Sequence, residues 1–165
     1  MEIYVGADHN GLEMKEELVE WLREKGHQVT DMGPSALEKD DDYPDYGIKV
    51  AKAVAEDPKN RHGILLCGSG VGMAVVADKV PGIRAALVHD PAVAQAARRD
   101  DDMNVLALGS QYISLAQAKK VITAWLTTPF AAEKRFVRRI NKIRQHEQKN
   151  SCACGTRGVP CSCDC

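Results

Sequence analysis

The stretch Gly63-Ile64-Leu65-Leu66-Cys67-Gly68-Ser69-Gly70-Val71-Gly72-Met73-Ala74 decides the fold of this chain. A short apolar run ends in Cys67, a glycine-rich turn follows, and residues 73–77 have the composition of a helix start. The pattern predicts a buried strand, a tight loop and a helix N-terminus. Backbone N–H groups of such a loop point toward negative charge, and the helix dipole adds to that field. The field makes the thiolate of a neighbouring cysteine more available, so a candidate base lies beside a site that stabilises an oxyanion.

The same stretch has a purely structural interpretation. A glycine-rich turn after a strand is common in doubly wound folds, and a cysteine at a strand end is often just a small apolar residue. The residues alone leave the chemical and the structural interpretation of Cys67 open.

Composition places the chain among globular proteins. Its 165 residues are enough for one domain with a full core, and 44% of them are hydrophobic and 27% charged. The formal net charge of −1 gives no field that would favour nucleic acid or a membrane surface. No apolar run approaches the length of a membrane span, and the first residues lack the pattern of a secretion signal. We therefore expect a cytoplasmic protein.

The cysteines are unevenly distributed. Cys67 is the only one before residue 150, and the other five are Cys152, Cys154, Cys161, Cys163 and Cys165. The predicted organisation is a folded domain over residues 1–149, without an internal disulfide, and a disordered cysteine-rich tail over residues 150–165. Thiolates this dense could bind a soft metal. Their spacing is not that of a zinc ribbon and no histidine accompanies them, so we prefer an extension without metal.

Strand-like and helix-like patterns alternate along the domain. The predicted strands cover residues 3–7, 27–32, the run ending at Cys67, 83–88 and 104–108, and the predicted helices cover residues 12–25, 46–55, a segment from 73, 92–99, 115–126 and 131–147. This alternation predicts an α/β fold: a Rossmann-like three-layer sandwich with a five-stranded, mostly parallel sheet and an additional C-terminal helix.

Ligands of such sheets bind outside the carboxyl ends of the strands. The residues expected to converge there are Asp8 and His9, residues 67–72, His89 and Asp90, and Gly109 and Ser110.

Five strings, in order and over roughly residues 1–148, resemble the ribose-5-phosphate isomerase type B family, which includes the galactose-6-phosphate isomerase subunits. They are Gly6-Ala7-Asp8-His9-Asn10-Gly11, Asp42-Tyr43-Pro44-Asp45-Tyr46, Cys67-Gly68-Ser69-Gly70-Val71-Gly72, Lys79-Val80-Pro81-Gly82-Ile83-Arg84-Ala85-Ala86 and Asn104-Val105-Leu106-Ala107-Leu108-Gly109. Each string alone is a weak signal, and the combination is specific. The resemblance implies an aldose–ketose isomerase that acts on a phosphorylated sugar through a cis-enediolate, without metal or cofactor.

The resemblance also implies roles for individual residues. Cys67 occupies the position of the base, and Ser69 matches a hydroxyl that could hold the thiolate or the sugar. The catalytic residues so implied are Cys67, Ser69, Asp8 and Asp100; the substrate-binding residues are His9, Tyr43, Gly68, Gly70, Val71, Gly72, Asn104, Arg135 and Arg139. The family has an arginine pair, four residues apart, that grips the sugar phosphate, as bidentate guanidinium groups do well.

Simpler interpretations exist for several of these residues. Asp8 could merely cap the helix that begins near Gly11, Tyr43 could only pack a turn, and His9 could be an ordinary surface histidine. Aligning Arg135 and Arg139 requires a one-residue insertion after Phe130. Lys134 and Arg138 are therefore the rival pair, and a solvated basic face is the structural alternative.

Two positions depart from the family pattern. Where the family usually carries a His-Asn pair, this chain has Asp100 and Asp101. The family's histidine is thought to help open the sugar ring as a proton carrier, often from the partner subunit. Aspartate has a reference pKa of about 3.9 against about 6.5 for histidine, so it donates a proton near neutral pH only if its pKa is strongly raised. Gln111 stands where many members have an arginine. Both departures leave the preferred sugar open.

Four functions therefore stand beside one another. The first is isomerisation of ribose 5-phosphate, and the second is isomerisation of a 6-phosphorylated hexose of the allose or galactose type. The third is a weakly active subunit of a hetero-oligomer. A nucleotide-binding module is the fourth and least favoured, because the Gly68-x-Gly70-x-Gly72 run follows the third strand instead of the first. We expect a homodimer or a dimer of dimers, with no nucleic-acid or membrane partner.

Overall fold

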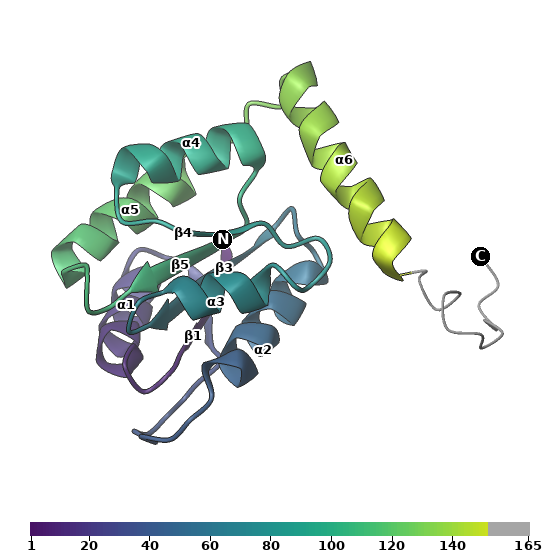
Figure 1. Cartoon of the computed structure of the whole chain (residues 1–165). Coiled ribbons are helices and arrows are strands. Elements are labelled where there is room, and N and C mark those ends of the chain that lie inside the picture. The colour runs from purple at the N-terminus through teal and green to yellow at the C-terminus, as the bar shows by residue number, and fades with distance from the viewer. Residues whose placement is uncertain (152–165) are drawn as a thin grey trace, which may run out of the picture.

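The computed structural model describes residues 1–151 and confirms the alternating pattern (Figure 1). The strands are β1 (Glu2–Ala7), β2 (Gln28–Asp31), β3 (Arg61–Cys67), β4 (Ala85–Leu87) and β5 (Val105–Gly109). The helices are α1 (Leu12–Glu24), α2 (Tyr43–Ala55), α3 (Val71–Ala77), α4 (Pro91–Asp101), α5 (Leu115–Thr127) and α6 (Lys134–Ser151).

The five strands form one sheet in the order β2-β1-β3-β5-β4, and every neighbouring pair is parallel. In the centre, Ile64 of β3 is in register with Val5 of β1 and Leu106 of β5. Because helices cover both faces of a parallel sheet, its central strands read as continuous apolar runs. Strand β3 is therefore the buried strand that the stretch ending in Cys67 predicted.

Each face of the sheet carries its own core. Ile64 and Leu66 pack on the face covered by α1, α4 and α5, where Trp125 is fully buried. Leu65 and Cys67 alternate to the other face, which α2 and α3 cover with side chains such as Met73. This arrangement confirms the three-layer sandwich, and it turns the Cys67 side chain toward α2 and α3.

The C-terminal helix α6 projects from the body of the domain (Figure 1). Its side chains Phe136 and Ile140 are buried, whereas most of its other described residues are exposed. The helix continues to Ser151, so the predicted tail of residues 150–165 begins within its last turn. Residues 152–165, with the predictions of disorder and of a metal-free cysteine cluster, lie outside the described residues. Within residues 1–151, no helix is both long and apolar enough to cross a bilayer.

Two helix boundaries bear on the site. Helix α2 begins at Tyr43 instead of residue 46, because Asp42 is its extended N-cap residue and Pro44 lies in its first turn. Helix α4 runs on to Asp101 and ends where Asp102 takes a left-handed conformation, φ 50°. Asp100 is therefore part of a helix and not of a loop.

Candidate active site

The predicted site residues fall into two groups at opposite edges of the sheet. The first group, which we call the edge cluster, lies at the carboxyl ends of the strands and consists of Asp8, His9, Tyr43, Cys67, Gly68, Ser69, Gly70, Val71 and Gly72. The second group lies at the amino-end edge and consists of Asp100, Asn104, Arg135 and Arg139. Because all strands run in one direction, a single chain does not bring the two groups together.

Cys67 is fixed at the end of β3. The backbone N–H of Gly70 donates a hydrogen bond to its Sγ atom over 3.0 Å, and its side chain is buried, with the residue 5% exposed. The Cys67 carbonyl accepts bonds from the backbone N–H of Ser110 (2.9 Å) and from its hydroxyl (3.1 Å). The sulfur is thus held in one place at the floor of the glycine-rich loop, as a base must be.

The loop requires glycine where it passes over the sheet. Gly70 has φ 79°, and a Cβ atom there would lie 2.4 Å from Cδ1 of Leu87 and 2.8 Å from the backbone of Leu108. Only glycine adopts this conformation and this close approach without strain. The loop therefore lies directly against the backbone of β5 and the Leu87 side chain of β4.

Ser69 is exposed on the same loop. Its hydroxyl accepts a hydrogen bond from the backbone N–H of Val71 over 3.3 Å. The hydroxyl therefore faces the backbone of the loop, and its contact with a sugar or with the Cys67 sulfur stays a prediction.

Asp8 follows β1 and makes the turn contacts expected of its capping role, while its catalytic role stays a prediction. Its Oδ1 atom accepts bonds from the backbone N–H groups of Asn10 (2.9 Å) and Gly11 (3.1 Å), which shapes the turn before α1. The side chain is nearly buried, and that burial raises the pKa of the Asp8 carboxyl above its ordinary value. A carboxyl with a raised pKa at the same edge of the sheet as Cys67 is suited to moving a proton.

His9 is held by a residue that the sequence did not single out. Its Nδ1 atom and its backbone N–H lie 2.6 Å and 3.2 Å from Oδ1 of Asp41. The bond to Asp41 is the largest cause that raises the pKa of His9. The run of three aspartates around Asp41 indicated only an acidic loop, because a contact across 32 positions leaves no local signal.

Two side chains flank the glycine-rich loop. The ring of Tyr43 lies so close to Gly72 that a Cβ atom there would be 2.8 Å from it, and the amide of Gln111 would be 3.2 Å from a Cβ atom on Gly68. His89, after β4, comes to the same edge: its Nε2 atom would be 3.2 Å from a Cβ atom on Gly109. These approaches confirm that the strand ends converge at the loop.

Asp100 is engaged with its neighbour in α4. The Arg99 guanidinium bonds its carboxylate over 2.7 Å and 3.1 Å, and this bond is the largest cause that lowers the pKa of Asp100. Arg135 and Arg139 add to the lowering. Asp100 is therefore ionised at neutral pH and is not a proton donor there.

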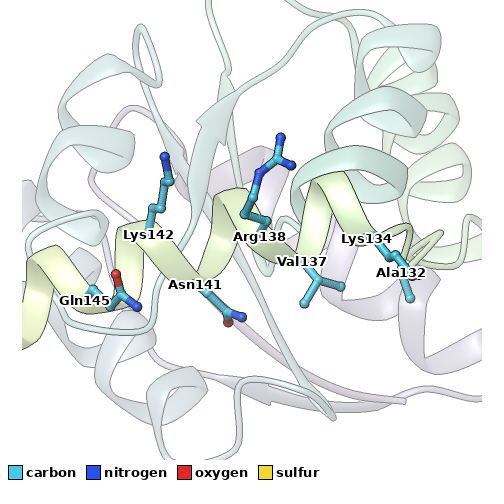
Figure 2. A pocket seen from close by; sticks show the side chains of 7 residues that line it. All are labelled: Ala132, Lys134, Val137, Arg138, Asn141, Lys142 and Gln145. Carbon is cyan, nitrogen blue, oxygen red and sulfur yellow. The ribbon is translucent and has the colours of Figure 1, made fainter.

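The two candidate cation pairs of α6 lie on different faces of the helix. The guanidinium groups of Arg135 and Arg139 lie 4.5 Å and 6.0 Å from the Phe136 ring. Lys134 and Arg138 instead line a groove of about 500 Å³ on α6, shown in Figure 2. The other residues of that groove are Ala132, Val137, Asn141, Lys142 and Gln145.

The polar atoms of Asn104 are bonded within its own chain. This residue precedes β5, at the edge of the sheet opposite Cys67, and is fully buried. Its Oδ1 atom accepts a bond from the Arg84 backbone N–H (2.8 Å), and its Nδ2 atom donates to the Gly82 carbonyl (2.9 Å). Both polar atoms hold the turn before β4, and a contact of Asn104 with the substrate stays a prediction.

The part of the chain that the structure describes contains no group of three or more His, Cys, Asp or Glu residues placed to hold a metal ion. The edge cluster offers proton-transfer groups and backbone N–H donors.

The chain is similar to known proteins over most of its length. Residues 3–143 match the family described as Ribose/Galactose Isomerase. Probable ribose-5-phosphate isomerase B of Mycoplasma pneumoniae is 40% identical over 147 residues, which cover 89% of this chain and 95% of that protein. D-erythrulose-4-phosphate isomerase of Pectobacterium atrosepticum is 42% identical over 130 residues, covering 79% and 85%. The crystal structure of ribose-5-phosphate isomerase B from Mycoplasma genitalium with bound ribulose 5-phosphate superposes with a TM-score of 0.87 at 38% identity, over 90% of this chain and 97% of that chain.

Proposed function

Because this chain belongs to the ribose/galactose isomerase family, we propose that it interconverts ribose 5-phosphate and ribulose 5-phosphate with Cys67 as the base. The observation that carries the proposal is the buried Cys67 sulfur, fixed by the Gly70 N–H at 3.0 Å under a loop rich in backbone donors. Asp8 and His9 lie at the same edge of the sheet. The relatives that carry this activity in their names match nearly the whole folded domain.

The first half of the reaction forms the cis-enediolate. The Cys67 thiolate takes the proton from C2 of the open-chain aldose, and the electron pair of that C–H bond becomes the C1–C2 double bond. Negative charge moves to the former carbonyl oxygen. Backbone N–H groups of residues 68–72 stabilise this oxygen, and one such donor typically contributes about 3 kcal/mol.

The second half returns the proton. The Cys67 thiol delivers it to C1 while the O2 hydroxyl loses its proton and becomes the ketose carbonyl. Asp8 is the group suited to carry a proton between O1 and O2, because its buried carboxyl has a raised pKa. No net proton is gained or lost, and the reaction requires no cofactor.

We propose that the active unit is a homodimer. The phosphate of the substrate requires cationic partners, and Arg135 and Arg139 lie at the opposite edge of the sheet from Cys67. Helix α6 projects from the body of its own chain, so it is available to a second copy (Figure 1). In such a dimer the arginines of one chain complete the site of the other. We also propose that the protein is located in the cytoplasm.

A second substrate class is favoured by one observation. Asp100 is ionised and paired with Arg99, so it does not supply the proton that ring opening requires. A tetrose 4-phosphate cannot close a five-membered ring, because its C4 hydroxyl carries the phosphate. Erythrulose 4-phosphate, the substrate in the name of the Pectobacterium relative, therefore needs no ring opening.

The test is turnover of the purified full chain with ribose 5-phosphate, erythrulose 4-phosphate, allose 6-phosphate and galactose 6-phosphate. We expect the highest kcat/KM with ribose 5-phosphate. A kcat/KM at least about tenfold higher with erythrulose 4-phosphate would replace the first substrate by the second. Turnover of none of the four sugars would contradict the isomerase proposal, and full turnover by a monomer in light scattering would contradict the shared site.

A further inference from the structure

Asp41 makes two bonds to His9 from a distant part of the chain. One oxygen, Oδ1, lies 2.6 Å from the His9 Nδ1 atom and accepts the His9 backbone N–H at 3.2 Å. The pair of bonds fixes both the ring and the backbone of His9. It also requires that Nδ1 carry a hydrogen, which leaves Nε2 as the ring atom that faces outward.

The Asp41 carboxylate is itself rigidly held. Its side chain is 3% exposed, and its second oxygen, Oδ2, is buried. The loop that carries it is anchored at its start by Lys15, whose Nζ atom bonds the Asp31 carboxylate (2.8 Å and 2.6 Å) and the Pro34 carbonyl (2.8 Å). A buried carboxylate is stabilised by a cationic neighbour, and His9 is the cationic group that Asp41 contacts.

The charges around His9 are negative on every side. Asp8 comes from the end of β1, and Asp40 and Asp41 come from the loop before α2. The Tyr46 hydroxyl, on α2, is near the same carboxylate: burial first, and then the charge of Asp41 and a side-chain hydrogen bond to Asp41, raise the pKa of Tyr46. Of the residues of the edge cluster, His9 alone can carry a positive charge, and the side chain over Gly68 is the neutral Gln111.

We propose that Asp41 is a positioning residue for His9: it fixes the imidazole at the rim of the edge cluster as a cationic donor for the phosphate of the substrate. The Nε2 atom lies 2.7 Å from the Asn10 amide, whose residue is exposed, so a phosphate oxygen can take the place of that amide. The raised pKa of His9 agrees with this role. The inference rests on the proposed function, since it assigns to Asp41 the positioning of one substrate-binding side chain of that site, beside the arginines proposed for the phosphate.

The experiment compares Asp41→Asn with the matched control Asp40→Asn in the full-length protein. Both variants remove one negative charge from the same loop, and only the first loses the bond to His9. The His9 pKa is measured by histidine NMR titration, and KM and kcat for ribose 5-phosphate are measured from about pH 6 to about pH 8. Asp41→Glu serves as the conservative variant, and thermal unfolding checks that each variant folds.

We expect Asp41→Asn to lower the His9 pKa by about 1 unit and Asp40→Asn to change it much less. KM for ribose 5-phosphate should rise about tenfold in Asp41→Asn at the upper end of the pH range, where its His9 is neutral. The rise should shrink toward about pH 6, kcat should change little, and Asp41→Glu should recover part of the loss.

An unchanged His9 pKa in Asp41→Asn, or a KM equal to that of Asp40→Asn, would overturn the inference while leaving the isomerase proposal intact. If the wild-type protein turns over no sugar phosphate, the proposed function fails instead. The His9 pKa and the affinity for inorganic phosphate, measured by the same titration, then test the role of Asp41 alone. If Asp41→Asn does not fold, Asp41→Glu carries the comparison: a lowered His9 pKa together with a raised KM supports the inference, and a change in one without the other contradicts it.

Discussion

The backbone nitrogen of Gly70 lies 3.0 Å from the sulfur of Cys67, three residues before it in the same loop. The geometry of the candidate base therefore depends on the conformation of a residue that makes no side-chain contact. Gly70 has φ 79°, and it lies against the backbone of Leu108 and the side chain of Leu87. A change in the loop conformation would move the sulfur and the N–H donors together.

Gly70→Ala tests this dependence. A Cβ atom at Gly70 would lie 2.4 Å from Leu87 Cδ1 and 2.8 Å from the Leu108 backbone, so the loop must shift. We expect the free energy of unfolding to fall by about 1 to 3 kcal/mol and kcat/KM to fall at least about tenfold. Thermal unfolding and steady-state kinetics measure both.

Gly26→Ala is the matched control for Gly70→Ala. Gly26 has a similar positive φ of 83°, yet a Cβ atom there would meet nothing within 4 Å. It should cost about 1 kcal/mol of stability and leave kcat/KM unchanged. If the two variants have the same kcat/KM, the close packing of the loop does not set the geometry of the site.

The shared site predicts complementation between inactive chains. Cys67→Ala removes the base, and Arg139→Ala removes a cation of α6. In a homodimer that shares its sites, a randomly mixed population contains about half heterodimers with one intact site each. The mixture should then regain about a quarter of the wild-type activity, measured after co-expression.

Arg138→Ala serves as the control in the same mixing experiment. Arg138 lines the groove on α6 (Figure 2), whereas Arg139 approaches the Phe136 ring. Complementation with Arg138→Ala in place of Arg139→Ala would assign the phosphate to the rival pair. Mixtures no more active than the sum of the separate variants would contradict a shared site.

Asp100→His should raise kcat/KM for ribose 5-phosphate near neutral pH. Asp100 is held ionised by Arg99, whereas an imidazole both accepts and donates a proton in that range. The gain should shrink for a substrate that is mainly open-chain, because that substrate bypasses ring opening. Asp101→His, one residue along the same helix, is the control. Absence of any gain between about pH 6 and about pH 9 would show that Asp100 does not limit ring opening.

The buried side chain of His62 should make the protein less stable in acid. It lies at the start of β3, is 2% exposed, and has a pKa lowered to about 4, mainly by burial. Between its ordinary pKa and about 4, the unfolded chain binds a proton that the folded chain does not. The free energy of unfolding should therefore fall as pH falls through this window, by up to about 3 kcal/mol from this group. Chemical denaturation at several pH values gives the slope of the free energy of unfolding against pH. In His62→Gln this slope should be shallower than in the wild type by the equivalent of one proton, and an unchanged slope would contradict the assignment.

The sequence predicted the edge cluster because each of its parts follows its own strand locally. Asp8 comes directly after β1, and Cys67 ends β3, so parallel strands were enough to place them together. Asn104 is not part of the edge cluster because its string crosses the sheet: β5 separates it from Gly109, a span of about 17 Å at the rise of a strand. A motif that spans a whole strand has its two ends at opposite edges of the sheet, and the motif alone does not show which end lies near the ligand.

Tertiary contacts account for what the sequence did not predict. Asp41 reaches His9 across 32 positions of the chain, from a loop without periodicity. Strand β5 inserts between β3 and β4, an order that no local pattern encodes. In the proposed homodimer, the contact of Arg135 and Arg139 with the substrate comes from a second chain, so the fold of one chain could not predict it.

The most direct test of Cys67 as the base is conversion of ribose 5-phosphate in D₂O, followed by proton NMR of the ribulose 5-phosphate formed. Proton transfer through Cys67 predicts that deuterium enters C1 of the product only to the extent that the thiol exchanges with solvent before it returns the proton, and that this exchange disappears with the base. Cys67→Ala should fold normally and lose at least about 100-fold in kcat. A folded Cys67→Ala variant that keeps the wild-type rate and the wild-type deuterium content at C1 would contradict the account.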